Sequence, residues 1–310
     1  MIEKFAYVFP GQGSQESGMG RDFYEHDTEV RQIFDEADQI MIDLGFRDGV
    51  KRACFEGIGL DKTRVVQPAL YVAEVAAYEK LQAHRKPDFV AGHSLGLHPA
   101  SYAASVYPTW QDGLRLVAAR GQLMEDAGRT HPGSMAAIMG STFDEVQEFI
   151  AGENIQIACH NGPKQIVIGG NTEAVLAVAT RLGKRARVLE VSVAGHTNQM
   201  ESALVSFAVA LDRTPMQLPT LGLVLDTTGE LATGVEQIRD AMRLQLVSTV
   251  LWVKTVMTLK DTGVGTMVEV GPGRGVLSGL IRQIDPSIRT FQVKDSASLD
   301  TFLSTYPHTM

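Results

Sequence analysis

The stretch Asp88-Phe-Val-Ala-Gly-His-Ser-Leu-Gly-Leu97 joins a short apolar run to a G-x-S-x-G pattern. The run at 89–91 predicts a strand, and the pattern around Ser94 is typical of a nucleophile elbow, a sharp turn from strand to helix. Such a turn brings backbone segments close together, so Gly92 and Gly96 suit it because they carry no side chain. The first amides of the next helix stay unpaired beside Ser94 and can stabilise an oxyanion. The stretch therefore predicts that Ser94 is a nucleophile.

The composition is that of a globular protein with one large domain or two. The chain has 310 residues, 44% hydrophobic and 21% charged, with a formal net charge of -8. An acidic chain of this kind is not expected to bind nucleic acid or an anionic membrane. The two cysteines lack metal-ligand spacing, and no apolar run approaches the roughly 18 residues that span a bilayer. We expect a cytoplasmic protein without a membrane segment.

Strands and helices alternate on both sides of the elbow. The run 5–9 is apolar and ends at Pro10, which suits a strand buried on both faces of a parallel sheet. The glycine-rich loop 11–20 follows it, but Glu16 occupies the last glycine position of a dinucleotide fingerprint. The loop instead places the amide of Gln12 near the carboxyl edge of the sheet, where open α/β sheets bind ligands. The fold predicted is α/β, with a large α/β-hydrolase-like domain built on a parallel sheet.

Residues 132–193 show a different order of elements. Strands are predicted at 135–139, 155–159, 165–169 and 187–193, with helices at 142–151 and 173–182. The order β-α-β-β-α-β is that of a ferredoxin-like unit. We therefore expect a small inserted domain at 132–193 and a discontinuous large domain at 1–131 and 194–310.

A serine nucleophile needs a base, and two histidines are candidates. His196 follows a predicted strand and precedes a helix, which is where a base facing a cleft belongs. His98 lies four residues after Ser94 on the same helix and could face either the cleft or solvent. His93 is expected to pack beneath the turn. Arg120, near the end of a predicted helix, is either a fork for a carboxylate or a solvated charge.

Four motifs occur in an order and at a spacing that resemble a known family: Phe9-Pro-Gly-Gln-Gly-Ser-Gln15, Gly92-His-Ser-Leu-Gly96, Arg120-Gly-Gln-Leu-Met124 and Val268-Glu-Val-Gly-Pro-Gly273. The set resembles malonyl-CoA:acyl-carrier-protein transacylases and the related stand-alone polyketide-synthase acyltransferases, over nearly the whole chain. The resemblance implies a ping-pong reaction in fatty-acid or polyketide biosynthesis. Ser94 would attack the acyl thioester with His196 as its base, and the thiol of an acyl carrier protein would then take the acyl group.

The resemblance also implies roles for the residues around this pair. The backbone amides of Gln12 and Leu95 match the oxyanion hole, and Arg120 matches the arginine that pairs with the free carboxylate of a malonyl group. Gln245 matches the residue whose backbone carbonyl orients the histidine. No metal or redox cofactor is implied, because coenzyme A and phosphopantetheine thioesters are substrates. The partners implied are an acyl carrier protein and an acyl-CoA, with the enzyme a monomer.

Three residues depart from the family pattern and are expected to shape the pocket. Leu97 and His98 stand where the family usually has a glutamate and a tyrosine, and this variant resembles an acyl-hydrolase branch. An acyl-thioester hydrolase is therefore the alternative function, and a non-catalytic carrier-binding module is a third. Gly195 precedes the histidine where a larger residue is usual, so we expect an enlarged pocket that admits α-substituted malonyl groups.

An acidic carrier protein would need a basic patch on this acidic chain. The segment 181–187 carries four positive charges in seven residues, among them Lys184 and Arg185. This segment is either the docking surface or an ordinary solvated surface.

Overall fold

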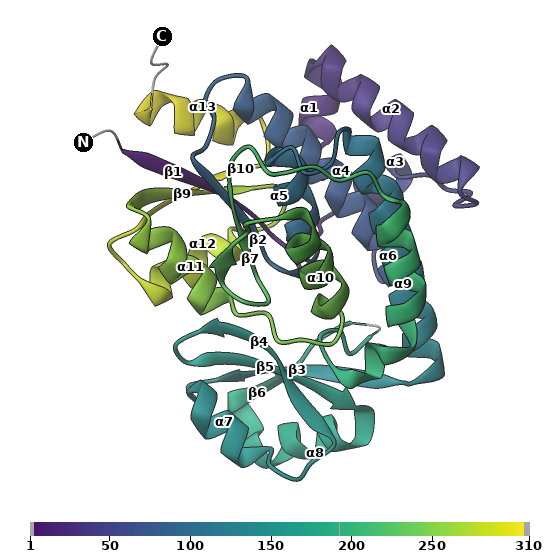
Figure 1. The fold of residues 1–310 in the computed structure, drawn as a ribbon, viewed down its shortest axis with the longest axis vertical. Coiled ribbons are helices and arrows are strands. Elements are labelled where there is room, and N and C mark those ends of the chain that lie inside the picture. The colour runs from purple at the N-terminus through teal and green to yellow at the C-terminus, as the bar shows by residue number, and fades with distance from the viewer. Residues whose placement is uncertain (1–2, 192, 307–310) are drawn as a thin grey trace.

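The computed structural model describes residues 3–191 and 193–306. Two sheets lie one above the other in Figure 1: a larger sheet flanked by helices, and a smaller sheet with two helices against its outer face. The chain leaves the large sheet once, builds the small sheet, and returns.

The large sheet has six strands, and all but the last are parallel to their neighbours. In spatial order they are β10 (Arg289–Val293), β9 (Val264–Val270), β1 (Lys4–Phe9), β2 (Phe89–Gly92), β7 (Gly222–Leu225) and the antiparallel β8 (Glu230–Leu231). The pairing of β1 with β2 ends at Phe9 opposite Gly92. This register brings the loop after β1, with Gln12, beside the elbow after β2, as the sequence predicted.

Alternation along β1 assigns its side chains to two cores. Phe5, Tyr7 and Phe9 point into the larger core with most of the helices, whereas Ala6 and Val8 point into a second core. The large rings therefore face the thicker helical layer, and the small side chains face the thinner layer on the other side. The helices of the first face are α1 (Arg21–His26), α2 (Thr28–Asp43), α3 (Lys51–Glu56), α4 (Thr63–Gln82), α5 (Leu97–Ala103), α6 (Trp110–Thr130), α9 (Leu204–Arg213), α10 (Val235–Gln245) and α13 (Ser296–Thr305).

The second face is covered by α11 (Trp252–Asp261), by α12 (Val276–Ile284) and by the small sheet itself. Met135, Ala137 and Val167 of the small sheet belong to the same core as Ala6 and Val8. The two sheets therefore share buried apolar surface, which holds the small unit against the large one.

The small sheet is antiparallel, in the order β4 (Ile155–Gly162), β5 (Gln165–Asn171), β3 (Gly133–Met139) and β6 (Ala186–Val188). With α7 (Phe143–Phe149) and α8 (Thr172–Leu182) it has the predicted order β-α-β-β-α-β. Its outer face has a core of its own, made chiefly of isoleucine and valine. Backbone hydrogen bonds from His160 to Val250 and from Val250 to Ala158 tie β4 to the large unit.

Three details of the predicted elements were inaccurate. The strand predicted at 187–193 ends at Val188, because β6 pairs with β3 only as far as Ala136; Ser192 lies outside the described residues. The helix predicted after His196 begins as a 3₁₀ segment, η3 (Asn198–Ala203), and continues as α9. The short helices α1, α3 and α13 were not predicted. In the described residues, none of the helices is long and apolar enough to cross a membrane.

Candidate active site

Ser94 lies at the carboxyl end of β2, at the start of the 3₁₀ segment η1 (Ser94–Gly96), with φ of 55°. A residue other than glycine in this region is strained, which is typical of a nucleophile elbow. A Cβ on Gly92 would lie 1.9 Å from the backbone carbon of Gly96, and one on Gly96 would lie 2.0 Å from the carbonyl oxygen of Phe9. Both glycines are therefore required by close backbone contacts, as the pattern predicted.

His196 is the histidine that the fold brings to Ser94. Its Nε2 lies 2.7 Å from Ser94 Oγ, and its Nδ1 lies 2.7 Å from the backbone oxygen of Gln245. A carbonyl only accepts, so Nδ1 carries the proton and donates it to Gln245, and Nε2 is free to accept from the serine hydroxyl. Burial, and next the charge of Arg120, lowers the pKa of His196 to about 3. The imidazole is therefore neutral at pH 7, the state that a general base requires.

Arg120 is not a solvated charge, because only 1% of it is exposed. Its guanidinium donates to the side-chain oxygens of Gln67 (2.7 Å) and Gln245 (3.0 Å), and to Ser94 Oγ (3.3 Å). Burial lowers the pKa of Arg120 to about 10, so the group remains a cation at pH 7. Its Nε is buried without a hydrogen-bond partner among the described residues. A cation with a free donor beside the nucleophile can bind an anionic group.

Asp226 and Gln67 belong to this network and were missed in the sequence. Asp226 is fully buried and accepts from the amide of Ser94 at 2.8 Å and from Gln245 Nε2 at 2.9 Å. A signal for it existed, because Asp226 directly follows the apolar strand β7, the neighbour of the strand carrying Ser94. Gln67 lies inside α4, where its amide also donates to Met124 Sδ at 3.4 Å. Nothing in the helical pattern of α4 distinguished it.

The predicted oxyanion-hole residues line the cavity that holds Ser94. Gln12 and Leu95 both face this cavity, which has a volume of about 130 Å³. Leu95 is the second residue of η1, so its amide precedes the first hydrogen bond within that turn. The two residues come from the ends of adjacent strands, β1 and β2, which are the positions needed to flank one acyl oxygen.

The three residues predicted to shape the pocket have different positions. Gly195 lines the cavity, and a Cβ added to it would lie 3.2 Å from the terminal methyl of Met124. Met124 thus occupies much of the space that the absence of a side chain at Gly195 was expected to leave open. Leu97 and His98 do not line the cavity, contrary to prediction. Both are fully buried on the inner side of α5, where His98 Nδ1 lies 2.8 Å from the hydroxyl of Tyr107.

His93 was expected to pack beneath the elbow, but it lines the Ser94 cavity. Its Nε2 lies 2.8 Å from Oδ1 of Asn161, a residue of β4. This contact links the nucleophile turn to the small sheet, which supplies one wall of the cavity.

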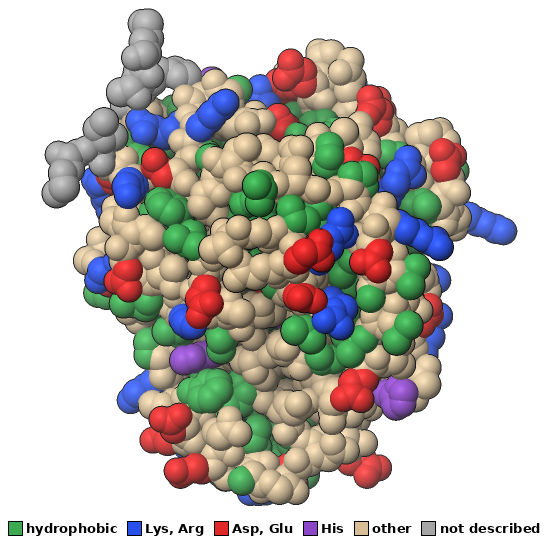
Figure 2. Space-filling model, viewed as in Figure 1, with side chains coloured by type: hydrophobic (Ala, Val, Ile, Leu, Met, Phe, Trp, Pro, Cys, Tyr) green, Lys and Arg blue, Asp and Glu red, His purple; other side chains and the backbone are tan. Residues whose placement is uncertain are grey.

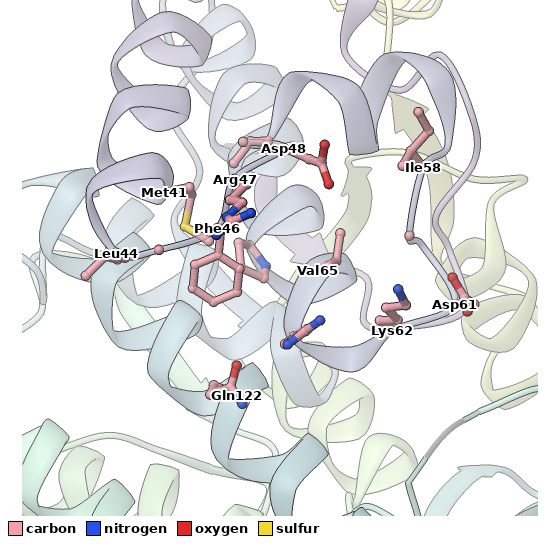
Figure 3. A pocket seen from close by; sticks show the side chains of 16 residues that line it. Met41, Leu44, Phe46, Arg47, Asp48, Ile58, Asp61, Lys62, Val65 and Gln122 are labelled. Carbon is pink, nitrogen blue, oxygen red and sulfur yellow. The ribbon is translucent and has the colours of Figure 1, made fainter.

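A second cavity, of about 500 Å³, lies over the helical layer (Figure 3). Its walls come from the end of α2, the following loop, the start of α4 and the second half of α6, and include Phe46, Lys62 and Gln122. The helices α4 and α6 meet at Gly121, where an added Cβ would lie 3.1 Å from the Cα of Arg64. Although larger than the Ser94 cavity, it contains no pair of nucleophile and base among its described lining residues, so we place the chemistry at Ser94.

Comparison with known proteins agrees with this geometry. Residues 6–299 match the family model of the acyl transferase domain. The malonyl CoA-acyl carrier protein transacylase of Bacillus subtilis (strain 168) is 32% identical over 98% of both chains. The crystal structure of FabD from Acinetobacter baumannii has a TM-score of 0.91 at 34% identity, again over 98% of both chains.

A third relative was solved as a complex, PlMCAT:AntF, in which a type II PKS acyl-carrier protein is bound to its malonyl-transacylase. The matched chain has a TM-score of 0.90 at 35% identity, and the match covers 98% of the present chain and 100% of the other. The chain therefore belongs to the acyl transferase domain family, among the malonyl CoA-acyl carrier protein transacylases.

Proposed function

We propose that this protein transfers a malonyl group from coenzyme A to the phosphopantetheine thiol of an acyl carrier protein through an acyl-Ser94 intermediate. One observation carries the proposal: Ser94 Oγ contacts both His196 Nε2, at 2.7 Å, and a guanidinium nitrogen of Arg120, at 3.3 Å. A base and a buried cation therefore converge on one hydroxyl. An acyl group with its own carboxylate satisfies both, because its carbonyl meets Ser94 while its carboxylate meets Arg120.

The first half-reaction follows from the protonation states of the site. Neutral His196 takes the proton of Ser94 as Oγ bonds to the thioester carbonyl carbon. The amides of Gln12 and Leu95 stabilise the oxyanion, and the carbon–sulfur bond then breaks. The imidazolium gives its proton to the departing thiolate of coenzyme A, and the acyl-serine remains. The backbone carbonyl of Gln245 replaces the carboxylate that orients the histidine in other serine enzymes.

The second half-reaction reverses these steps with a new thiol. The phosphopantetheine thiol gives its proton to His196 and attacks the acyl-serine carbonyl, and the serine leaves with the proton returned by the imidazolium. Neither half-reaction needs a metal or redox group, because the acyl carbon has the same oxidation level in the thioester and in the acyl-serine ester. The names of the relatives support malonyl-CoA and an acyl carrier protein as the two substrates.

We also propose that the large unit is α/β-hydrolase-like, that residues 132–193 form a separate domain, and that the protein is a cytoplasmic monomer. The arrangement of Ser94 at the carboxyl end of a parallel strand supports the first of these.

Hydrolysis of an acyl thioester is the alternative function. It uses the same serine and base with water as the second acceptor. Arg120 argues against a hydrolase for simple acyl chains, because a buried cation with an unpaired Nε would face an apolar chain that cannot bind it. Leu97, the residue that suggested a hydrolase, lies outside the pocket.

The size of the acyl group depends on Gly195 and Met124. We infer that an α-substituent of the malonyl group would fill the space at Gly195 only when Met124 moves aside. Methionine is unbranched and flexible, so this movement costs little. An α-substituted malonyl group therefore remains within the proposed substrate class.

The direct test is the intact mass of the protein after brief exposure to malonyl-CoA or acetyl-CoA. The proposal expects a stable malonyl adduct in the native chain, none in Ser94→Ala, and little acetyl adduct. Delivery of the adduct to a phosphopantetheinylated carrier protein would complete the reaction. Rapid release of free coenzyme A and free acid, without an adduct or transfer, would contradict the proposal and favour the hydrolase.

A further inference from the structure

Asp226 is a buried carboxylate to which the mechanism above assigns no role. It follows β7 directly and has no exposed surface. One of its oxygens, Oδ2, accepts from the backbone amide of Ser94 at 2.8 Å. Both of its oxygens lie 2.9 Å from Gln245 Nε2, which also donates to the carbonyl of Ser94 at 3.0 Å.

These contacts fix the side-chain amide of Gln245 in one orientation. Its nitrogen faces the carboxylate of Asp226 and the Ser94 carbonyl, which only accept, so its oxygen must face Arg120. The backbone carbonyl of the same residue receives the proton of His196 Nδ1. One residue, Gln245, thus contacts the base, the cation and the nucleophile strand, and Asp226 holds it in place.

Asp226 also supports the strained backbone of the nucleophile. A positive φ at a serine is strained and persists only where surrounding contacts hold it. A hydrogen bond from an amide to a carboxylate is stronger than one to a neutral group. Among the described residues no cation lies within ion-pair distance of Asp226. Gln245 contacts both Asp226 and Arg120, and the charge of Arg120 acts on Asp226 across this distance.

We propose that Asp226 is a positioning residue of the reaction: as a carboxylate it holds the Ser94 amide and the Gln245 side chain, and through Gln245 it sets Arg120 for the acyl carboxylate. The part that concerns the acyl carboxylate rests on the proposed function. The part that concerns Ser94 and His196 does not, since any reagent that acylates or phosphonylates Ser94 depends on the same turn.

Protonation of Asp226 should disrupt this arrangement. A protonated carboxyl must place its O–H against the Ser94 amide or the Gln245 amide, both of which are donors. Burial raises the pKa of Asp226 to about 6, although the hydrogen bonds from Gln245 and Ser94 and the charge of Arg120 oppose this. The ionised form, present above pH 6, is the competent one, so activity should fall as the pH drops through 6.

His196, Cys159 and Arg120 do not account for a fall in that range. Burial lowers the pKa of His93, which lines the Ser94 cavity, and a fall that disappears in Asp226→Asn separates Asp226 from it. His196 has a pKa of about 3 and stays neutral. Cys159, on β4, stays a thiol because burial and next the charge of Asp226 raise its pKa. Arg120, on α6, stays charged with a pKa of about 10. A substrate carboxyl of ordinary pKa is already ionised at pH 5.

The test compares the native chain with Asp226→Asn and Asp226→Ala. The Asn variant keeps one acceptor oxygen and the same shape but cannot ionise. Single-turnover loading by malonyl-CoA is measured by quenched intact mass from pH 4.5 to 8. In parallel, the rate at which a neutral alkyl fluorophosphonate labels Ser94 measures the reactivity of the serine–histidine pair with a reagent that carries no carboxylate. Thr227→Val is the matched control, because its hydroxyl is buried without a hydrogen-bond partner among the described residues.

The proposal expects the native rate to fall tenfold per pH unit below pH 6 and the Asn variant to lose this dependence. At pH 7 the Asn variant should load malonyl at least about tenfold more slowly, as expected for a lost charged hydrogen bond, and Thr227→Val should match the native chain. If the Ala variant does not fold, the Asn variant alone decides.

Two results would overturn the proposal. One is an Asn variant that is loaded and labelled as fast as the native chain. The other is a slower Asn variant whose loading rate still falls as the pH drops through 6. Failure of the proposed function is a separate result: the native chain would then take no malonyl adduct, while fluorophosphonate labelling would still measure the effect of Asp226 on Ser94.

Discussion

At the scale of single residues, Arg120 is the group that separates the proposed substrate from simple acyl chains. It is a buried cation whose partners in the described residues are neutral: two glutamine side chains and the hydroxyl of Ser94. A buried cation without a contacting anion is costly unless one arrives with the substrate. The selectivity of the enzyme for a carboxylated acyl group should therefore depend on this one side chain.

Replacement of Arg120 by alanine should lower the rate of malonyl loading on Ser94 about a hundredfold, because a charged, forked contact is lost. Acetyl loading should fall much less, since the acetyl group has no carboxylate. Both rates can be measured by intact mass at early times. Arg115→Ala, an exposed arginine on the same helix, is the control and should load normally. Equal losses with malonyl-CoA and acetyl-CoA would show that Arg120 does not read the carboxylate.

Gly195 offers a second prediction at this scale. Its absent side chain would meet only the end of Met124, which can move. Gly195→Phe should therefore reduce loading by methylmalonyl-CoA at least about tenfold more than loading by malonyl-CoA, because a ring and an α-substituent compete for one space. Competition between the two substrates, followed by mass, measures the ratio. An unchanged ratio would place the α-substituent elsewhere.

At the scale of elements, the elbow depends on close contacts between backbone segments, and a change of side-chain rotamer cannot relieve a clash there. The Cβ of an alanine at position 96 would lie 2.0 Å from the carbonyl oxygen of Phe9. Such a close contact with backbone would force β1 and the elbow apart, and this movement would separate Gln12 from Ser94. The packing of two strand ends is therefore a condition for the oxyanion hole as well as for the fold.

Gly96→Ala should lower the free energy of unfolding by about 3 kcal/mol or more and abolish acylation of Ser94. Gly279→Ala in α12 is the matched control, because nothing lies within 4 Å of the added Cβ. That change should stabilise the chain by about 0.5–1 kcal/mol, since alanine favours a helix over glycine. Urea unfolding of both variants checks the contrast, and similar midpoints would disprove it.

Other elements show why sequence patterns detect some structure and miss the rest. The strands β1 and β2 and the helix α6 were predicted because they carry clear apolar patterns. The helix α13 was missed although Asp295 and Ser298 form a capping box at its start. Its apolar face rests on only two buried side chains, Leu299 and Phe302. A short helix is stabilised mainly by the surface on which it packs, and that surface is remote in sequence.

At the scale of the whole molecule, the proposed carrier protein must dock where its prosthetic arm can reach Ser94. On the face seen in Figure 2, Lys and Arg side chains are interspersed with Asp and Glu side chains. Within the segment 181–187, Arg181 pairs with Glu153 at 2.7 Å and lies over the ring of Phe149. Lys184, Arg185 and Arg187 remain exposed, close to the strand that leads to the cavity wall.

The double change Lys184→Glu and Arg185→Glu should raise the apparent KM for a carrier protein about three- to tenfold, with little effect on loading from malonyl-CoA. The effect should shrink at high salt, because exposed charges are screened. The same charge reversal at Lys4 and Lys86, exposed near the amino ends of β1 and β2, is the control. A carrier KM unchanged by the first pair, or equally changed by both, would exclude this segment from docking.

Short sequence patterns were enough to specify the local chemistry of this protein. The glycines around Ser94, the parallel alternation of strands and helices, and the inserted β-α-β-β-α-β order are all encoded in short patterns. They depend on steric and hydrophobic rules that act between near neighbours. The order of motifs along the chain added the resemblance that assigned His196, Arg120 and Gln245 their expected roles.

The polar groups that meet in the active site could be identified only once the chain was folded. Asp226 and Gln67 were missed, and His98 was placed on the wrong side of its helix, because each depends on partners 9 to 132 residues away along the chain. Burial turned Arg120 from an ambiguous charge into a cation beside the nucleophile, and it set the pKa values of His196 and Asp226. Hydrogen bonding and desolvation are properties of the assembled core, and no local pattern contains them.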